Sequence, residues 1–272
     1  MKFVCPVCNE PFSSTENGSL RCRNNHSFDR SKDGYYNLLL SSSGGVHGDN
    51  KEMLSARRRF LESGAYEPLA RAVFEELSSR LSSSSELLDM GCGEGYYTDY
   101  VSKAASEFGK PFSLHAFDIS KDAVKLAAKR NKSISFIVAS SYHVPALSES
   151  FDGVFNVFSP LAIEETARVL KPGGIFVMAI PDENHLFALK AAIYDKPYKN
   201  EPQESELPGF ELLSTRRLAY PLKLDSREKI NDLFMMTPYA YRTGARERER
   251  ISRLDTLECN AEFIVFTYRK DF

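Results

Sequence analysis

The segment from Leu87 to Thr98, LLDMGCGEGYYT, joins an apolar run to glycines at alternate positions, Gly91, Gly93 and Gly95. An apolar run that ends in a glycine-rich turn is typical of a buried strand turning sharply into a helix. Glycine lets the backbone approach a ligand closely, and the helix that follows begins with unpaired N–H groups. The segment therefore predicts a strand–turn–helix unit that binds a nucleotide-type cofactor.

Two neighbouring residues narrow the class of cofactor. Tyr96 occupies the sixth position of the G-x-G-x-x-G pattern, where nicotinamide-dinucleotide proteins have a small residue. Asp89 precedes the first glycine by two residues, and this D-x-G-x-G-x-G arrangement resembles the first motif of class I S-adenosylmethionine-dependent methyltransferases. In that family the glycine turn packs against the methionine end of the cofactor. Asp89 also fits a carboxylate that caps the turn, a role compatible with cofactor binding.

Strands and helices alternate along most of the chain after a helical stretch from Lys51 to Leu81. The expected strands are Leu87–Met90, Ser113–Phe117, Ser135–Ala139, Gly153–Phe158, Ile175–Ile180, Glu211–Leu222 and Phe263–Tyr268. The expected helices among them are Tyr97–Phe108, Lys121–Arg130, Leu161–Leu170, His185–Ile193 and Arg227–Phe234. Lys171-Pro172-Gly173-Gly174 is typical of a stop between a helix and a strand. This order predicts an α/β fold with a doubly wound, mainly parallel, Rossmann-like sheet.

Composition and charge bound the remaining possibilities. With 42% hydrophobic and 26% charged residues the chain is typical of a globular protein, and its net charge of −2 does not indicate a nucleic-acid binder by itself. It has no apolar run of about 18 residues for a membrane span, and its first residues lack the apolar stretch of a signal peptide, so we expect a cytoplasmic protein with no membrane partner. We expect a metal-binding unit at 1–36, a linker and basic helix at 37–60, with Leu40–Asn50 rich in Ser and Gly, and a catalytic domain at 61–272.

Two residues at strand ends are candidates for contacts to the nucleoside part of the cofactor. Asp118 ends the second strand, and an acid at this place in doubly wound folds accepts hydrogen bonds from ribose hydroxyls. It also fits the start of the next helix, where Ser120 is a candidate cap. Ser140 ends the third strand, where this superfamily places a residue beside the adenine.

Cysteine spacing in the first 26 residues indicates a metal site. Cys5 and Cys8 form a C-x-x-C pair, and Cys22 and His26 follow with C-x-x-x-H spacing. Three thiolates and an imidazole favour tetrahedral zinc and leave no open position, so we expect a structural site. A redox pair would begin a helix in a thioredoxin-like pattern, which is absent. A unit this small has too little core to fold without such a ligand.

The linked order of these motifs resembles one family over nearly the whole chain. CPVC…CRNNHSFDRSKDGYYNLL, GDNKEMLSARRRFLESGAYEPL and LLDMGCGEGYYT, with ENHLFALK and MTPYAYR, are similar to the RlmA family of 23S rRNA methyltransferases. These enzymes methylate N1 of a guanine in a hairpin loop of domain II, and two subfamilies modify neighbouring guanines there. The resemblance implies zinc at Cys5, Cys8, Cys22 and His26, and a homodimer. The resemblance also assigns cofactor contacts to Tyr66, the Glu94-Gly95 turn and His185. Without the resemblance, Tyr66 fits a packing residue and His185 fits a helix cap.

Basic clusters are the candidates for contacts to 23S rRNA. Arg57, Arg58 and Arg59 follow Lys51 on one helical stretch and are the stronger phosphate candidates. The second cluster, Arg242–Arg253, alternates Arg with Glu and fits a solvated helix face about equally well.

Methylation of guanine N1 requires alignment of donor and acceptor and removal of the N1 proton. Asp182, Glu183 and His185 lie in a suitable segment to take that proton, and Asn156 and Ser159 to hold the base edge, but the sequence does not assign a catalytic residue. Two alternatives stay open: a small-molecule methyltransferase of the same fold, and an inactive zinc-ribbon RNA-binding scaffold.

Overall fold

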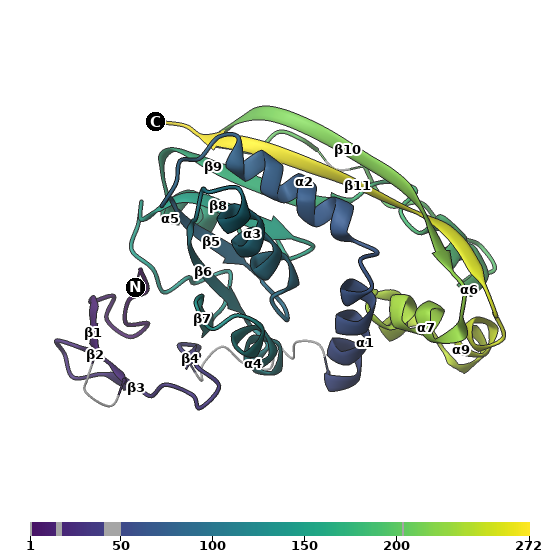
Figure 1. The fold of residues 1–272 in the computed structure, drawn as a ribbon, viewed down its shortest axis with the longest axis horizontal. Coiled ribbons are helices and arrows are strands. Elements are labelled where there is room, and N and C mark those ends of the chain that lie inside the picture. The colour runs from purple at the N-terminus through teal and green to yellow at the C-terminus, as the bar shows by residue number, and fades with distance from the viewer. Residues whose placement is uncertain (1, 15–17, 41–49, 203) are drawn as a thin grey trace.

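A computed structural model describes residues 2–14, 18–40, 50–202 and 204–272, so most of the expected Leu40–Asn50 linker lies outside the described residues. Its main feature is an eight-stranded sheet (Figure 1). In order across the sheet the strands are β10 (Phe210–Leu224), β11 (Leu257–Lys270), β9 (Leu170–Pro181), β8 (Phe151–Val157), β5 (Glu86–Met90), β6 (Ser113–Asp118), β7 (Ser135–Val138) and β4 (Tyr36–Asn37). The strands from β9 to β4 are parallel, whereas β11 and β10 add an antiparallel edge. The predicted doubly wound, mainly parallel sheet is confirmed.

Two apolar clusters cover the two faces of the sheet. Side chains alternate along each strand, so Leu87 enters one cluster and Leu88 the other. Helices α2 (Glu67–Ser78), α3 (Tyr96–Glu107) and α4 (Lys121–Arg130) contribute to the first cluster, and α5 (Ile163–Val169) to the second. Helices on both faces are what a parallel sheet requires, because each right-handed crossover returns over one face.

The N-terminal unit completes the core on the α5 face. It contains a small antiparallel sheet of β1 (Phe12–Ser14), β2 (Leu20–Cys22) and β3 (Ser27–Phe28). Phe3 and Leu20 are buried in the second cluster, and the Phe3 ring meets the His115 ring edge-on at 5.6 Å. The Val4 N–H donates to the Pro145 carbonyl at 2.8 Å. This unit is therefore packed into the main domain.

The antiparallel hairpin of β10 and β11 carries a group of helices beyond the end of the sheet (Figure 1). Helices α7 (Arg227–Met235), α8 (Tyr239–Arg242) and α9 (Ala245–Ser252) connect β10 to β11, and α6 (Phe187–Ile193), which follows β9, packs beside α9. Helix α1 (Lys51–Glu62) packs against α7, which joins the segment before the glycine turn to the C-terminal part of the chain. Among the described residues, no helix has the length and apolar character needed to cross a bilayer.

Two sequence predictions about element boundaries were wrong. The helix expected from Lys51 to Leu81 is divided into α1 and α2 by a turn that includes Gly64, whose φ of +82° is not helical. Lys171–Gly174 does not precede a strand but lies inside β9, which begins at Leu170 because that residue pairs with Phe151. The strands β10 and β11 are also several residues longer than predicted, since each continues the pairing of the other.

Candidate cofactor and metal sites

The three glycines after β5 have different surroundings. A Cβ on Gly91 would lie 2.0 Å from the Ser159 Oγ, and one on Gly95 would lie 2.8 Å from the Cβ of Ala127. Both residues have φ near +85°, which favours glycine. A Cβ on Gly93 would meet nothing closer than the Arg57 Nη1 at 3.8 Å. Gly93 is therefore the position of this turn with room for a ligand.

Asp118 holds the glycine turn from the end of β6. Its Oδ2 accepts the Gly93 N–H at 2.9 Å, and its Oδ1 accepts the Ser120 N–H at 2.8 Å. Ser120 in turn caps α4, because its Oγ accepts the Ala123 N–H. Asp118 therefore fixes Gly93 and the start of α4 at the same time. The two roles considered for Asp118 therefore belong to different residues. Ser120 caps the helix, and Asp118 faces the glycine turn.

Asp89 lies inside the protein and links β5 to α3. It is 2% exposed, and its Oδ2 accepts the Thr98 hydroxyl at 2.5 Å. Burial raises the pKa of this carboxyl to about 7, with a smaller contribution from the charge of Asp118. Asp89 therefore ties the end of β5 to the first turn of α3 through the Thr98 side chain, and no backbone N–H of the turn is bonded to it among the described contacts.

Two buried polar atoms next to the glycine turn lack partners among the described residues. Glu94 is 1% exposed, and its Oε2 pairs with the Arg130 Nη2 at 2.5 Å, but its Oε1 accepts no hydrogen bond. The Tyr97 hydroxyl, in the first turn of α3, is also unpartnered. Burial raises the pKa of Glu94, while Arg130 opposes this effect. Buried polar groups are normally satisfied, so a ligand with polar groups fits this place.

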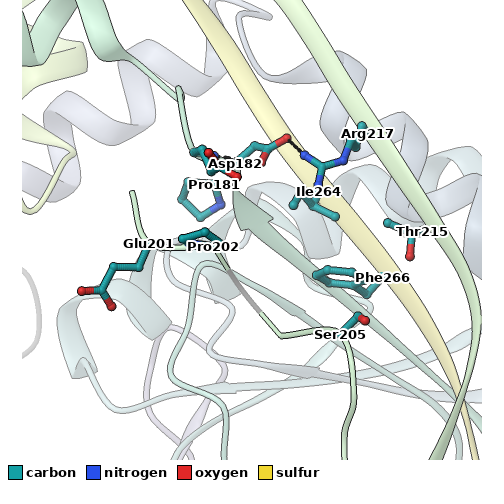
Figure 2. A pocket seen from close by; sticks show the side chains of 10 residues that line it. Pro181, Asp182, Glu201, Pro202, Ser205, Thr215, Arg217, Ile264 and Phe266 are labelled. Atoms are coloured by element: carbon teal, nitrogen blue, oxygen red, sulfur yellow. Dashed lines mark hydrogen bonds and ion pairs between the residues drawn. The ribbon is translucent and has the colours of Figure 1, made fainter. Parts of the chain in front are cut away.

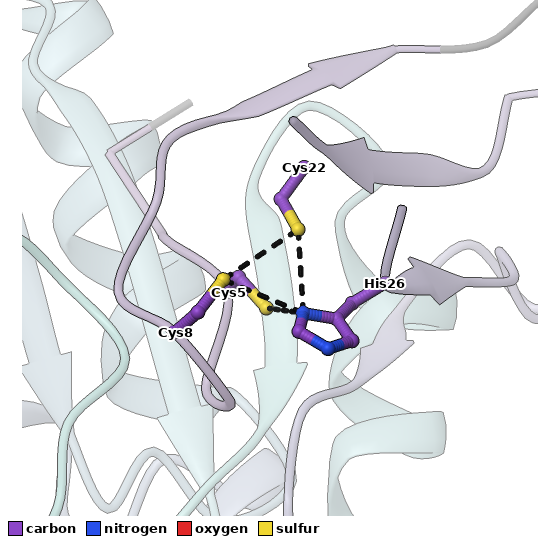
Figure 3. A group of neighbouring side chains, drawn as sticks. All are labelled: Cys5, Cys8, Cys22 and His26. Atoms are coloured by element: carbon purple, nitrogen blue, oxygen red, sulfur yellow. Dashed lines mark hydrogen bonds between the residues drawn. The ribbon is translucent and has the colours of Figure 1, made fainter. Parts of the chain in front are cut away.

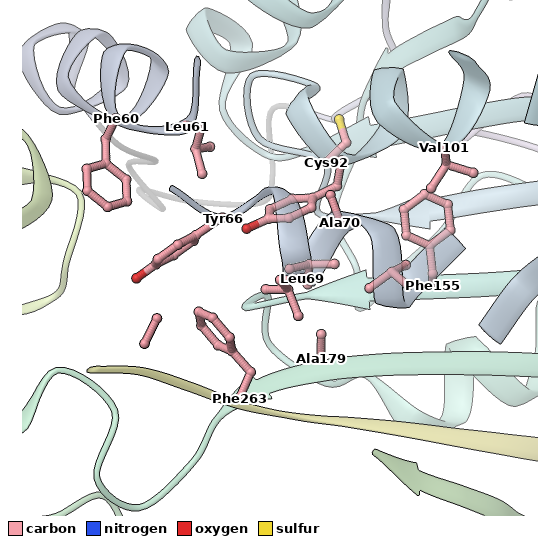
Figure 4. Close-up of a cluster of buried hydrophobic side chains, with 14 of the residues drawn as sticks. Phe60, Leu61, Tyr66, Leu69, Ala70, Cys92, Val101, Phe155, Ala179 and Phe263 are labelled. Atoms are coloured by element: carbon pink, nitrogen blue, oxygen red, sulfur yellow. The ribbon is translucent and has the colours of Figure 1, made fainter. Parts of the chain in front are cut away.

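Tyr66 and His185 meet in an aromatic cluster near the turn between α1 and α2. The Tyr66 side chain is fully buried, and its ring contacts Phe60 at 5.1 Å and Phe263 at 4.9 Å between centroids (Figure 4). Its hydroxyl lies 3.3 Å from the His185 Nε2. The two residues are 119 positions apart in the sequence, and the structure brings them together as the family resemblance implies.

The hydrogen bonds of His185 fix its tautomer. The Glu262 backbone N–H donates to Nδ1 at 3.1 Å, so the proton of the neutral ring is on Nε2 and is donated to the Tyr66 hydroxyl oxygen. Burial lowers the pKa of His185 to about 3. The ring is therefore uncharged at neutral pH and has no free lone pair to accept a proton.

Ser140 lies beside the Asp118 segment, as expected for neighbouring strand ends. Ala139 donates its N–H to the Asp118 carbonyl, and the Ser140 Oγ accepts the Tyr142 N–H at 3.2 Å. After β8, the Asn156 amide bonds within its own turn: Oδ1 accepts the Ser159 N–H at 3.2 Å. Asn156 is 3% exposed, so it organises this turn and does not present a free edge.

The Asp182–Glu183 segment lines a separate pocket of about 180 Å³ (Figure 2). Asp182 pairs there with Arg217, and Ile264 and Phe266 line the same pocket. These two residues alternate with Phe263 along β11 and belong to the second core cluster. The pocket therefore lies on the face of the sheet opposite Tyr66, and the Asp182 carboxylate is directed away from the Tyr66 cluster.

The N-terminal cysteines and histidine converge into one cluster (Figure 3). The His26 Nδ1 lies 3.5, 3.4 and 3.5 Å from the sulfurs of Cys5, Cys8 and Cys22, and all four ligand atoms lie within 4.8 Å of one another. Around a tetrahedral zinc with Zn–S bonds of about 2.3 Å and a Zn–N bond of about 2.0 Å, the nitrogen and each sulfur are about 3.5 Å apart, which matches these separations. A hydrogen bond with the Glu10 backbone lowers the pKa of Cys8 to about 6, which favours the thiolate that a metal needs. The cluster is a structural zinc site.

The three arginines of α1 have separate surroundings. The Arg57 Nη1 lies 3.8 Å from where a Cβ on Gly93 would stand, whereas Arg58 pairs with Glu62 at 2.8 Å. Arg59 makes a bidentate pair with Asp232 of α7, at 2.9 and 2.5 Å. Arg59 therefore joins α1 to α7, and Arg57 is the member of this group closest to the glycine turn.

In the Arg242–Arg253 cluster, several arginines bond within the protein. Arg253 pairs with Glu249 one turn earlier, Arg250 with Asp195, and Arg248 donates to the Ala240 carbonyl at 2.5 Å. These contacts fit the reading of a helix face that pairs with its neighbours.

Comparison with known proteins agrees with this arrangement. A methyltransferase domain model matches residues 88–178, and the N-terminal zinc-ribbon model of RlmA matches residues 3–40. A protein from Bacillus subtilis named a putative 23S rRNA (guanine-N1-)-methyltransferase is 31% identical, over 94% of this chain and 92% of that protein. The chain belongs to the RlmA family. A Streptomyces fradiae protein named 23S rRNA (guanine(748)-N1)-methyltransferase is 29% identical over 90% of this chain and 88% of its own length.

Solved structures support the fold of this RlmA-family protein. A putative methyltransferase from Bacillus halodurans aligns with a TM-score of 0.50 and 14% identity, over 74% of this chain and 99% of the other. The YcgJ protein of Bacillus subtilis aligns with the same TM-score and 17% identity, over 77% and 99% of the two chains. The methyltransferase domain model indicates S-adenosylmethionine as the cofactor, and the zinc-ribbon model together with the Cys₃His cluster indicates zinc in the N-terminal unit.

Replacing Gly91 by alanine is expected to destabilise the protein by about 2–5 kcal/mol, because the new Cβ overlaps Ser159 and the backbone remains left-handed. Urea denaturation followed by circular dichroism measures this change. Gly109→Ala is the matched control: its φ of +69° is also left-handed, but a Cβ there meets nothing within 4 Å, so only about 1–2 kcal/mol is expected. Equal losses in the two variants would contradict the packing argument.

Replacing Asp89 by asparagine is expected to flatten the dependence of stability on pH. The folded-state pKa of about 7 exceeds the unfolded value of about 4, so the folded protein holds a proton that the unfolded chain releases. The free energy of unfolding therefore falls as pH rises from about 4 to 7. Asp89→Asn should gain stability relative to the wild type across this range, in urea titrations at pH 5, 6, 7 and 8. The control variant Asp271→Asn, at an exposed position, should leave the pH dependence of stability parallel to that of the wild type. If the Asp89→Asn curve were also parallel to the wild type, the raised pKa of Asp89 would be refuted.

Replacing Cys22 by serine is expected to abolish zinc binding. The purified wild-type protein should contain one zinc ion per chain by mass spectrometry of the metal, and the variant almost none. Its melting temperature should also fall, because Phe3 and Leu20 depend on the N-terminal unit to enter the core. Cys259→Ser, on β11 and outside the cluster, should retain the metal; zinc retained by Cys22→Ser would exclude this ligand set.

Proposed function

We propose that this protein transfers a methyl group from S-adenosylmethionine to N1 of a guanine in a hairpin loop of domain II of 23S rRNA. The observation that carries the proposal is the union, in one chain, of a glycine turn held by Asp118 and a Cys₃His unit packed into the same core. Two relatives that align with about nine-tenths of the chain, at 31% and 29% identity, are named as 23S rRNA guanine-N1 methyltransferases, the first of them as putative.

We assign the cofactor to the residues around the glycine turn. They are Tyr66, Asp89, Gly91, Gly93, Glu94, Gly95, Asp118, Ser140 and His185. Direct contacts are supported at Gly93, which has room, at Asp118, which bonds to the Gly93 N–H, and at Glu94, whose Oε1 lacks a donor among the described residues. Asp89, Gly91 and Gly95 support the turn from inside.

S-adenosylmethionine supplies a methyl group on a positively charged sulfur. His185 stays neutral next to Tyr66, so the pair adds no positive charge that would repel a cation at this site. His185 is not the base for the guanine N1 proton, because Nδ1 already accepts the Glu262 N–H. The buried aromatic rings around Tyr66 exclude water from this side of the site.

An RNA substrate must approach the cofactor, and the arginines of α1 are the candidates for the contacts that guide it there. We propose that Arg57, Arg58 and Arg59 contribute to phosphate attraction, with Arg57 beside Gly93 of the cofactor turn. We further propose that the protein acts as a cytoplasmic homodimer, in which the unit at 1–36 serves RNA recognition, 37–60 links it to the catalytic part, and 61–272 carries methyl transfer. Sedimentation velocity with and without RNA tests the dimer.

Incubation of the purified protein with unmethylated 23S rRNA and labelled S-adenosylmethionine should place label in the RNA and create one new primer-extension stop within domain II. The stop is expected because a methyl group on N1 blocks the pairing edge of guanine. Asp118→Ala should lose the stop, since it releases the glycine turn. Label in a metabolite extract but not in rRNA would favour a small-molecule methyltransferase, and failure to bind S-adenosylmethionine would favour a scaffold.

A further inference from the structure

Phe158, the residue after β8, has a backbone conformation that its side chain disfavours. Its φ is +59°, and among the described residues it is the only aromatic one in the left-handed region. This conformation is unfavourable for a residue with a branched or bulky side chain. Such an outlier persists only where its surroundings impose it, and outliers of this kind cluster at functional sites.

The turn that imposes this conformation is fixed from three sides. The Phe158 N–H donates to the Ala179 carbonyl of β9 at 3.1 Å. The Asn156 side chain accepts the Ser159 N–H at 3.2 Å and closes the turn beneath Phe158. Ser159 packs directly on Gly91, where a Cβ would lie 2.0 Å from its Oγ. The position of Phe158 is therefore tied to the glycine turn of the cofactor site.

The Phe158 ring forms the exposed rim of the aromatic cluster around Tyr66. It contacts the rings of Phe263 at 5.5 Å, Tyr97 at 6.2 Å and Tyr66 at 6.3 Å between centroids. These three rings are at most 9% exposed, whereas Phe158 is 39% exposed. The buried rings support one part of Phe158 and leave the rest open to solvent. The result is an apolar surface of fixed orientation, because its neighbours are packed.

A nucleobase matches this surface in shape and chemistry. A base whose N1 is to be methylated must leave its stack, and unstacked bases are held by aromatic side chains. Phe158 lies at the end of β8, next to β5 in the sheet, so a base on its ring would be adjacent to the glycine turn. The neighbouring Tyr97 hydroxyl is buried without a partner among the described residues and is available to a polar group brought by a ligand.

We propose that the target guanine stacks on the exposed face of the Phe158 ring, an inference that rests on the proposed function. Asn156 and Ser159 act through Phe158 as positioning residues, since they fix its turn. Gly91 is then needed for binding of the guanine as well as of the cofactor, because only glycine leaves space for Ser159, which fixes the Phe158 turn.

Three variants test this role: Phe158→Leu, which keeps an apolar side chain without an aromatic face, Phe158→Tyr, which keeps the face, and Phe108→Leu. Phe108 is a matched exposed aromatic at the end of α3, away from the strand ends that form the site. Methylation rates with 23S rRNA are measured at saturating S-adenosylmethionine, and cofactor affinity by calorimetry. We expect Phe158→Leu to lower kcat/KM for RNA about 5- to 150-fold, the range for one lost base stack. Phe158→Tyr should stay within about threefold of the wild type, and Phe108→Leu should equal it.

The affinity for S-adenosylmethionine distinguishes stacking of the guanine on Phe158 from packing of the Phe158 ring on the cofactor. The dissociation constant for S-adenosylmethionine should stay unchanged in Phe158→Leu. A parallel loss of cofactor affinity would show that the ring packs on the cofactor and would overturn the proposal, as would full activity of Phe158→Leu or equal impairment of Phe158→Tyr. A wild-type protein that binds the cofactor but leaves rRNA unmethylated would instead contradict the proposed function, and the guanine platform with it.

Discussion

The contact between Gly91 and Ser159 constrains the whole of the proposed active site. It brings the end of β5, where the cofactor turn begins, against the end of β8, where the Phe158 turn begins. Neither turn can relax alone, because one is held by Asp118 and the other by Asn156. The arrangement around the parallel strand ends follows from this close approach. A methyl donor and an acceptor must be aligned to within fractions of an ångström, and two interlocked turns provide such a frame.

Polar groups in this frame are arranged so that few charges face the reaction centre. The buried Asp89 carboxyl accepts the Thr98 hydroxyl, and the Glu94 carboxylate forms an ion pair with Arg130. His185 is neutral because burial lowers its pKa to about 3, and the Glu262 N–H bond to Nδ1 fixes which ring nitrogen carries the proton. A neutral imidazole next to Tyr66 suits a reaction in which a cationic sulfur becomes neutral, since it adds no positive charge that would oppose binding of the donor.

The sequence predicted the features that local patterns encode. Apolar runs and glycines located β5 and its turn, and cysteine spacing located the zinc ligands, because these depend on residues close in the chain. Contacts between distant segments were not predictable in this way. Arg59, whose role toward phosphate stays a prediction, pairs with Asp232, which is 173 residues away and which no local pattern links to it. The resemblance assigned Tyr66 and His185 to the cofactor but did not predict their contact. The left-handed turn at Phe158 has no signal in NVFSP, a segment that reads simply as the end of a strand.

The hydrogen bonding of β4 to β7 connects the N-terminal zinc unit to the outer edge of the large sheet. Strand β4 follows the zinc unit directly and pairs with the outer side of β7, and the Leu38 N–H extends this pairing to the Val138 carbonyl. Without β4, β7 would become the edge of a parallel sheet, with apolar side chains and unpaired backbone groups exposed. Such edges recruit strands from other molecules. The N-terminal part of the chain that holds the metal cluster therefore also covers the outer side of β7, so that this strand does not offer an open edge to other molecules.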